Sequence, residues 1–118
     1  MATASGHARL HIDGRDTGLR VRQALSWGAR ALGLLATPRL DDPCGLWISP
    51  CPSVHTVGMR YAIDVIFLAP DGRILKLCPQ LRPWRAAGAR GAHSTLELRA
   101  GLARHLGLQA GQVLTLQA

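Results

Sequence analysis

The chain has little of several residue types on which small folds and sites often depend. Aromatic residues make up 4% of its 118 residues, and a single lysine accompanies thirteen arginines. Its three cysteines form no Cys-x-x-Cys pair, which argues against a disulfide framework and a zinc knuckle. We therefore expect Cys44, Cys51 and Cys78 to be free thiols, and we expect no bound metal or cofactor.

Long apolar runs and targeting signals are also missing. Residues 1–10 are polar and lack the apolar segment of a secretory signal, and no apolar run approaches the length of a membrane span. These absences predict a soluble, cytoplasmic protein without membrane contacts. The length suits one globular domain and is too short for two independent cores, so we expect a single domain over residues 1–118, of which 1–7 are flexible.

Acidic residues are scarce. Seven of them stand against fourteen basic residues, which gives a formal charge of +7 that attracts acidic partners. The basic residues are spread from Arg9 to Arg104 and do not form the block that is typical of a nucleic-acid-binding arm. A GC-rich genome also produces arginine in place of lysine, so the basic, Arg-rich composition is compatible with nucleic acid as a partner but does not require it.

Short strand patterns are present along most of the chain. The runs with alternating or β-branched composition are residues 8–12, 19–22, 45–48, 63–68, 73–77, 94–98 and 113–116. Residues 63–68 are the most apolar, so we expect a central strand whose side chains are buried on both faces. The Ala-Pro-Asp-Gly turn at 69–72 provides a fixed proline φ and a permissive glycine, and therefore predicts an antiparallel hairpin with residues 73–77.

Two segments have helical spacing. Apolar residues recur with the period of a helix over 24–35, and a short helix over 100–106 ends at Gly107. Residues 79–92 have no periodicity and are expected to be a long loop. The whole pattern predicts a mainly β (α+β) domain: a compact antiparallel β-sandwich or partly open barrel of six to seven short strands with two short helices.

Three segments follow patterns that are shared beyond this chain. Residues 30–35 read Arg-Ala-Leu-Gly-Leu-Leu, residues 50–68 include Pro-Ser-Val-His-Thr and Met-Arg-Tyr-Ala-Ile-Asp, and two Leu- and Gly-containing elements lie at 96–101 and 106–111. Together they resemble the DUF192 family of small prokaryotic proteins, whose role is undetermined. The resemblance spans about residues 30–114, implies a small β-sandwich or barrel, and transfers no catalytic residue.

This chain also departs from the DUF192 pattern. Another branch of the family carries Trp-Met-Lys-Asn-Thr where this chain has His55 to Met59, so a role for His55 is not shared by the whole family. Gln112 stands where aspartate is common.

The unusual polar side chains gather before the central strand, where a loop can present them. We predict a polar pocket near this loop, formed by His55, Met59, Arg60, Asp64 and Glu97. An imidazole beside a carboxylate can transfer protons or bind a metal, and a half-buried carboxylate needs a partner, for which Arg60 is a natural candidate. The alternative is structural: His55 satisfies loop backbone groups, and Asp64 caps or bridges at the start of the strand.

Two enzymatic interpretations use the same residues. Cys51 lies four positions before His55, a spacing that allows a thiol–imidazole contact without requiring it. With Asp64, these residues would make a thiol- or metal-assisted hydrolase. Zinc prefers nitrogen and sulfur ligands such as Cys51, His55 and His93, but no fourth ligand is evident, so no metal is predicted. The sequence assigns no catalytic residue.

A second surface is basic. Arg82, Trp84, Arg85, Arg90 and His93 combine cations with an aromatic ring, a mixture that can bind phosphates and stack bases. A solvated basic loop is the other interpretation. We therefore predict a small binding or accessory module, a monomer or weak dimer, with a small ligand or a protein as its partner. A hydrolase and a nucleic-acid-associated protein are the alternatives.

Overall fold

A computed structural model describes residues 4–24, 45–51, 53–56 and 61–117. These residues form nine strands and one short helix. The elements are β1 (Ala4–Ile12), β2 (Arg15–Ala24), β3 (Gly45–Ile48), β4 (Ser53–His55), β5 (Ile63–Leu68), β6 (Ile74–Leu81), β7 (Ala86–Gly88), β8 (Ser94–Arg99), α2 (Leu102–Leu106) and β9 (Leu114–Gln117). The prediction of a mainly β chain is confirmed.

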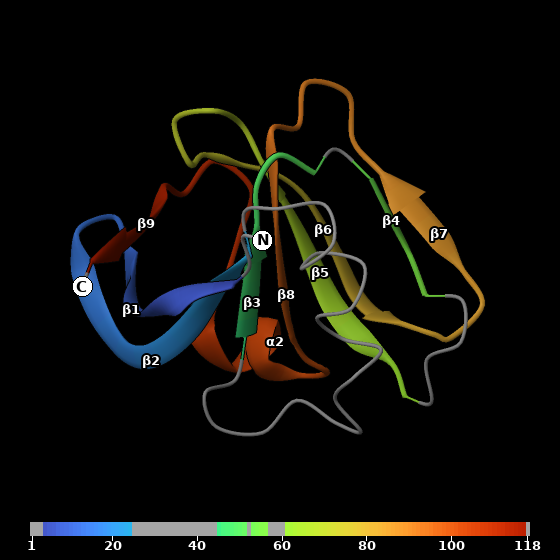
Figure 1. Cartoon of the computed structure of the whole chain (residues 1–118), viewed down its shortest axis with the longest axis horizontal. Coiled ribbons are helices and arrows are strands. Elements are labelled where there is room, and N and C mark those ends of the chain that lie inside the picture. The colour runs from blue at the N-terminus through green and yellow to red at the C-terminus, as the bar shows by residue number, and fades with distance from the viewer. Residues whose placement is uncertain (1–3, 25–44, 52, 57–60, 118) are drawn as a thin grey trace.

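Seven strands form one sheet in the order β6-β5-β8-β3-β2-β1-β9, and β4 pairs with β7 in a small second sheet. Figure 1 shows β1, β2 and β9 at one side of the molecule and the β4–β7 pair at the other. The large sheet is open. Its edge strands β6 and β9 approach each other at the isolated Arg73–Val113 bridge but do not pair along their length, so the sheet is not a closed barrel.

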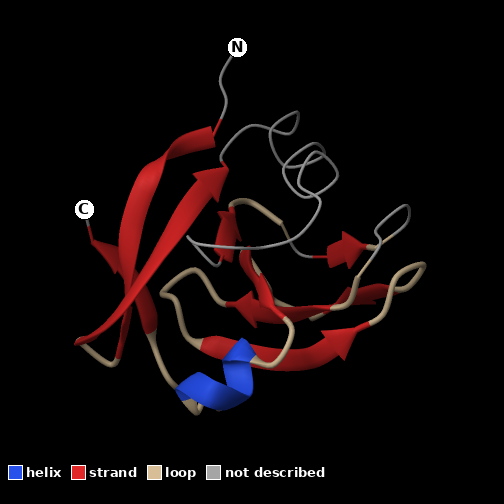
Figure 2. Cartoon of the chain, turned by 90° about the horizontal axis from the view of Figure 1, so that it is seen from below, coloured by secondary structure: helices blue, strands red, loops and turns tan. Residues whose placement is uncertain are grey.

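The predicted antiparallel arrangement holds for every pair of neighbouring strands in the large sheet except one. Strands β2 and β3 pair in parallel, with Val21 opposite Gly45. A parallel pair needs a crossover of a dozen or more residues, and residues 25–44 give the chain that length. The helix predicted over 24–35 lies almost wholly within this segment, outside the described residues. The other predicted helix is α2, the one helix among the described residues (Figure 2), so two helices are not supported.

The central strand β5 divides the interior into two cores. All six of its residues are buried. Ile66 and Leu68 belong to the first core, while Ile63, Val65 and Phe67 belong to the second. The prediction that 63–68 is a strand covered on both faces is therefore confirmed.

The second core lies on the face of the large sheet that also meets the small sheet. It includes Leu46 and Ile48 of β3 and Val54 of β4, and Ala87 of β7 packs against it. The first core includes side chains from β1, β2, β5, β8 and α2. No helix of the described residues is long and apolar enough to cross a membrane.

The long loop predicted over 79–92 is wrong in part. Strand β6 continues to Leu81, and β7 occupies Ala86–Gly88. Pro79 is tolerated within β6 because that strand is at the edge of the sheet, where a missing N–H breaks no interior ladder.

Candidate functional site

Asp64 is held by backbone groups. Its side chain is buried, at 1% exposure. Oδ1 accepts the N–H of Gln80 at 2.8 Å, and Oδ2 accepts the N–H groups of Gly101 at 3.0 Å and Ala103 at 2.9 Å. The carboxylate therefore joins three segments that are distant in sequence.

Each of these hydrogen bonds gives an acceptor to a backbone N–H group, in the bulge of β6 or at the start of α2. Residues 79 and 80 of β6 form a bulge, since Ile63 pairs with Leu81 and Val65 pairs with Cys78. The N–H of Gln80 in this bulge is bound by Asp64. At the other oxygen, α2 has no side-chain cap from Gly101, its own N-cap residue. Asp64 supplies that cap from β5, which is the structural interpretation that the sequence left open.

Glu97 has a different environment. It lies on β8 directly opposite Leu46 of β3 and Val65 of β5, two apolar residues of the second core. The residue is 4% exposed, and its Oε2 atom has no hydrogen-bond partner in the described part of the chain. Burial raises the pKa of the Glu97 carboxyl from 4.5 to about 8, because an apolar environment disfavours the charged form. At neutral pH this group is mainly protonated.

The predicted site residues are separated by the sheet. Asp64 pairs with Leu98 of the first core, whereas Glu97 pairs with Val65 of the second. Directly paired residues share a face, so the two carboxyl groups point to opposite faces.

His55 lies on the small sheet. It is exposed on β4, next to the buried Val54. Met59 and Arg60 lie outside the described residues.

Cys51 and His55 do not form the dyad of a thiol enzyme in this structure. The Cys51 thiol donates to the carbonyl oxygen of Ser53 at 3.1 Å, and no hydrogen bond joins it to His55 among the residues described. Across those same residues, no group of three or more His, Cys, Asp or Glu side chains could hold a metal ion.

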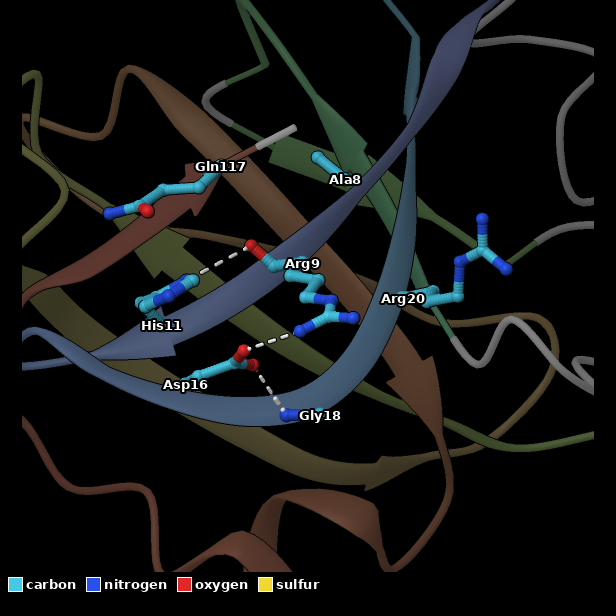
Figure 3. Close-up of a pocket in the computed structure, with 7 residues that line it drawn as sticks. All are labelled: Ala8, Arg9, His11, Asp16, Gly18, Arg20 and Gln117. Carbon is cyan, nitrogen blue, oxygen red and sulfur yellow. Dashed lines mark hydrogen bonds and ion pairs between the residues drawn. The ribbon is translucent and has the colours of Figure 1, made fainter.

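A groove of about 520 Å³ lies on the outer face of β1, β2 and β9 (Figure 3). Its lining residues are Ala8, Arg9, His11, Asp16, Gly18, Arg20 and Gln117. Arg9 is directly opposite Arg20 on one side and Gln117 on the other. Figure 3 shows the Arg20 guanidinium directed away from that of Arg9. Guanidinium groups in a polar groove are suited to carboxylates and phosphates.

One acid partly neutralises this groove. Arg9 Nη1 is 2.9 Å from Asp16 Oδ2, and the other Asp16 oxygen accepts the Gly18 N–H at 2.7 Å. The Gly18 hydrogen bond, followed by the Arg9 hydrogen bond, lowers the pKa of Asp16 below 3.8. Sequence analysis did not find the groove. The available signal was arginine on the polar face of two strands separated by an Asp-Gly turn.

Comparisons with known proteins agree with the fold. The family model of DUF192, described as uncharacterized ACR, matches residues 8–116, which confirms the resemblance seen in the sequence. A crystal structure of a putative transcription regulator from Sinorhizobium meliloti 1021 superposes with a TM-score of 0.83 at 22% identity, over 98% of this chain and 97% of that one.

A second solved structure is also similar. It is a protein of unknown function from Novosphingobium aromaticivorans DSM 12444, with a TM-score of 0.73 at 22% identity over 92% of this chain and 84% of that one. At this identity, both likenesses show the fold alone. No curated protein matches the chain.

Proposed function

The chain belongs to the DUF192 family, and we propose that this member is a small binding module whose ligand pairs with the carboxyl group of Glu97. The observation that carries the proposal is the buried Oε2 atom without a partner among the described residues. Such atoms are rare, because burying a polar group without a hydrogen bond costs free energy. Leucine would fill this position between Leu46 and Val65 at lower cost. A retained carboxyl group supports a role in binding.

The proposed pocket lies on the second-core face, between the large sheet and the β4–β7 pair. Val54 of β4 and Ala87 of β7 reach the core that flanks Glu97. The proposed ligand enters between the two sheets. His55 is next to the core-facing Val54 on β4, so its side chain points to the other face of the small sheet. Met59 and Arg60 follow His55 in the chain and are the remaining candidates for contacts. Asp64 lies on the opposite face, where it binds backbone N–H groups and does not contact the proposed ligand.

The chemistry of Glu97 restricts the ligand. Oε2 has no hydrogen-bond partner in the described part of the chain, and a small amine or amide provides an N–H that a carboxyl oxygen accepts in either protonation state. An amine would bind the ionised carboxylate as a charge-assisted pair, and an amide would bind the protonated acid through two hydrogen bonds. A carboxylate ligand can accept the O–H of the protonated acid at neutral pH, but above about pH 8 it would place two negative groups together, which disfavours it there.

The experiment is a titration of isotope-labelled protein at about pH 9, where Glu97 is mainly ionised, with propylammonium, propionamide and propionate, followed by amide chemical shifts. We expect propylammonium or propionamide to shift the amides of Leu46, Val65 and Glu97, and propionate to leave them unchanged. Glu97→Leu should abolish these shifts, while the isosteric Glu97→Gln should retain binding of propionamide only. Equal shifts in Glu97→Leu, or no shift with any of the three probes, would refute the proposal.

The hydrolase has weaker support. A nucleophilic Cys51 would need a base within hydrogen-bond distance, but its thiol instead donates to Ser53. Both oxygens of Asp64 accept backbone N–H groups, which leaves this carboxylate little capacity to orient a catalytic histidine.

Association with nucleic acid is a second candidate function. It is supported by the formal charge of +7 and by the description of one similar structure as a putative transcription regulator. Long-range attraction of this kind favours polyanions in general. Salt-dependent binding of an oligonucleotide tests it.

A further inference from the structure

Trp84 is the large hydrophobic residue that the structure leaves exposed. Its exposure is 66%, and no other large apolar side chain among the described residues is comparably open. It occupies the turn at residues 82–85 between β6 and β7, which we call the Trp84 turn. A single exposed apolar residue is not unusual in itself, but the turn that carries Trp84 has a fixed backbone conformation.

The backbone at Trp84 adopts a conformation that bulky residues avoid. Its φ is +63°, in the left-handed region. This conformation costs roughly 1–2 kcal/mol for a residue with a Cβ, and it persists only where surrounding contacts enforce it. The side chain is therefore presented to solvent by a backbone that is fixed in an unfavourable state.

A buried threonine holds the turn in this conformation through hydrogen bonds. Thr56 is 0% exposed and lies directly after β4. Its carbonyl oxygen accepts the Trp84 N–H at 2.9 Å, and its N–H donates to the Arg85 carbonyl at 2.8 Å. Its hydroxyl donates to the Arg82 carbonyl at 2.6 Å and accepts the Arg85 N–H at 2.7 Å. These hydrogen bonds connect Thr56 to three of the four residues of the turn.

The surroundings of Trp84 are cationic. Arg82 and Arg85 are both exposed and flank it. Residues 72–96 contain four arginines, one lysine and no acidic residue. A protein-binding hot spot would be expected within a larger apolar patch that excludes water. An isolated exposed ring with two exposed arginines close to it in the chain instead matches a base with its adjacent phosphates.

We propose that the Trp84 turn is a stacking platform for single-stranded nucleic acid, with a base on the indole ring and phosphates on Arg82 and Arg85. This inference is independent of the Glu97 pocket. It rests on the nucleic-acid candidate above and gives that candidate a defined surface. Because stacking is available to every base, the contact should show little sequence preference.

The test measures fluorescence anisotropy of a labelled dT20 oligonucleotide with the full chain at 50 mM and 200 mM NaCl. Trp84→Ala should weaken binding by roughly 5- to 100-fold, as loss of one stacked base does. Trp84→Phe should retain most of the affinity because it keeps an aromatic ring. Arg85→Ala should weaken binding and reduce the salt slope by about 0.7, the value for one phosphate of a single strand.

Two controls separate stacking from general charge. Arg20→Ala removes the same charge on β2, outside the Trp84 turn, and should have a smaller effect than Arg85→Ala. An abasic oligonucleotide of equal length keeps the phosphates. Wild type should bind it more weakly than dT20 by about the factor lost in Trp84→Ala, and the variant should not distinguish the two.

The possible failures are distinct. If dT20 binds wild type and Trp84→Ala equally, the platform is refuted while nucleic-acid association stands. If dT20 does not bind at 50 mM NaCl, both are refuted. Circular dichroism of each variant confirms that a change in affinity does not come from loss of the fold. Trp84→Gly, which relieves the backbone conformation, gives a second variant without the ring.

Discussion

At the scale of single residues, Asp64 shows how a carboxylate can organise a fold rather than perform chemistry. Asp64→Asn keeps the size of the side chain but replaces one acceptor oxygen with an NH₂ group. Either the Gln80 N–H or the Gly101 and Ala103 N–H groups then lose their acceptor in a buried place. We expect a loss of about 2–3 kcal/mol in urea denaturation.

Asp71→Asn is the matched control for Asp64. Its Oδ1 accepts the Arg73 N–H at 3.0 Å in an exposed turn, where water replaces a lost contact. That variant should lose under about 1 kcal/mol. Equal losses in the two variants would mean that the buried network does not contribute as the structure indicates.

Cys51 is the residue that decides between a binding module and a thiol enzyme. Its thiol donates to Ser53, two prolines flank it in the sequence, and no basic residue lies within three positions. We expect iodoacetamide to label Cys51 no faster than Cys78, since both are half-buried and reactivity follows thiolate content and access. Peptide mapping between pH 6 and 9 measures the rates, with Cys44 in the same digest. Much faster labelling of Cys51 at neutral pH would favour the hydrolase.

At the scale of elements, the turn between β5 and β6 connects two distant parts of the sheet. Gly72 has a φ of +90°, and its carbonyl accepts the Leu114 N–H at 2.9 Å. A Cβ at this position would overlap the carbonyl oxygen of Leu114. Gly72→Ala should therefore cost the left-handed strain of about 1 kcal/mol and, in addition, the contact between the two sheet edges.

Gly111→Ala is a control that introduces the left-handed backbone strain without a steric overlap. Gly111 has a similar φ of +95°, and a Cβ added there would meet no atom within 4 Å. We expect thermal denaturation to show a clearly larger loss for Gly72→Ala than for Gly111→Ala. Similar losses would show that the contact between Gly72 and Leu114 adds little.

The same elements show what local patterns can predict. Strand β5 was predicted over 63–68 because β-branched apolar residues and a Pro-Asp-Gly turn are local signals. Strands β4 and β7 were missed because three residues each are too few for an alternating pattern. The parallel pairing of β2 with β3 was missed because it depends on partners across a crossover, which no local pattern reports.

The contacts of the candidate site residues also depend on partners that are distant in the sequence, which local patterns do not report. The contacts of Asp64 lie 16, 37 and 39 residues away along the chain. The sequence predicts Glu97 as a half-buried carboxylate, and the structure buries it at 4% exposure. The sequence does not predict that the Glu97 side chain faces the second core, away from Asp64, because that depends on the register of β8 with β3 and β5.

At the scale of the whole molecule, the large sheet separates two cores, and Glu97 places an ionisable group in one of them. In the unfolded chain the Glu97 carboxyl has a pKa near 4.5, and in the folded chain burial raises it to about 8. Between these values the folded state holds a proton that the unfolded state has lost. The free energy of unfolding must therefore decrease as the pH rises through this range.

The size of this effect can be measured against a variant that does not titrate. A difference of one pKa unit corresponds to about 1.4 kcal/mol, so ionisation of Glu97 should remove roughly that much stability per pH unit between about pH 5 and pH 8, with no further loss above pH 8.

Glu97→Gln should lack this slope and exceed wild type by a few kcal/mol at pH 8. Urea denaturation of both proteins from pH 5 to 9 gives the difference, in which the histidines they share cancel. Asp16, whose pKa is lowered, contributes only below about pH 4. Parallel curves for the two proteins would show that Glu97 ionises in the fold as it does in water, and would remove the physical basis for the proposed pocket.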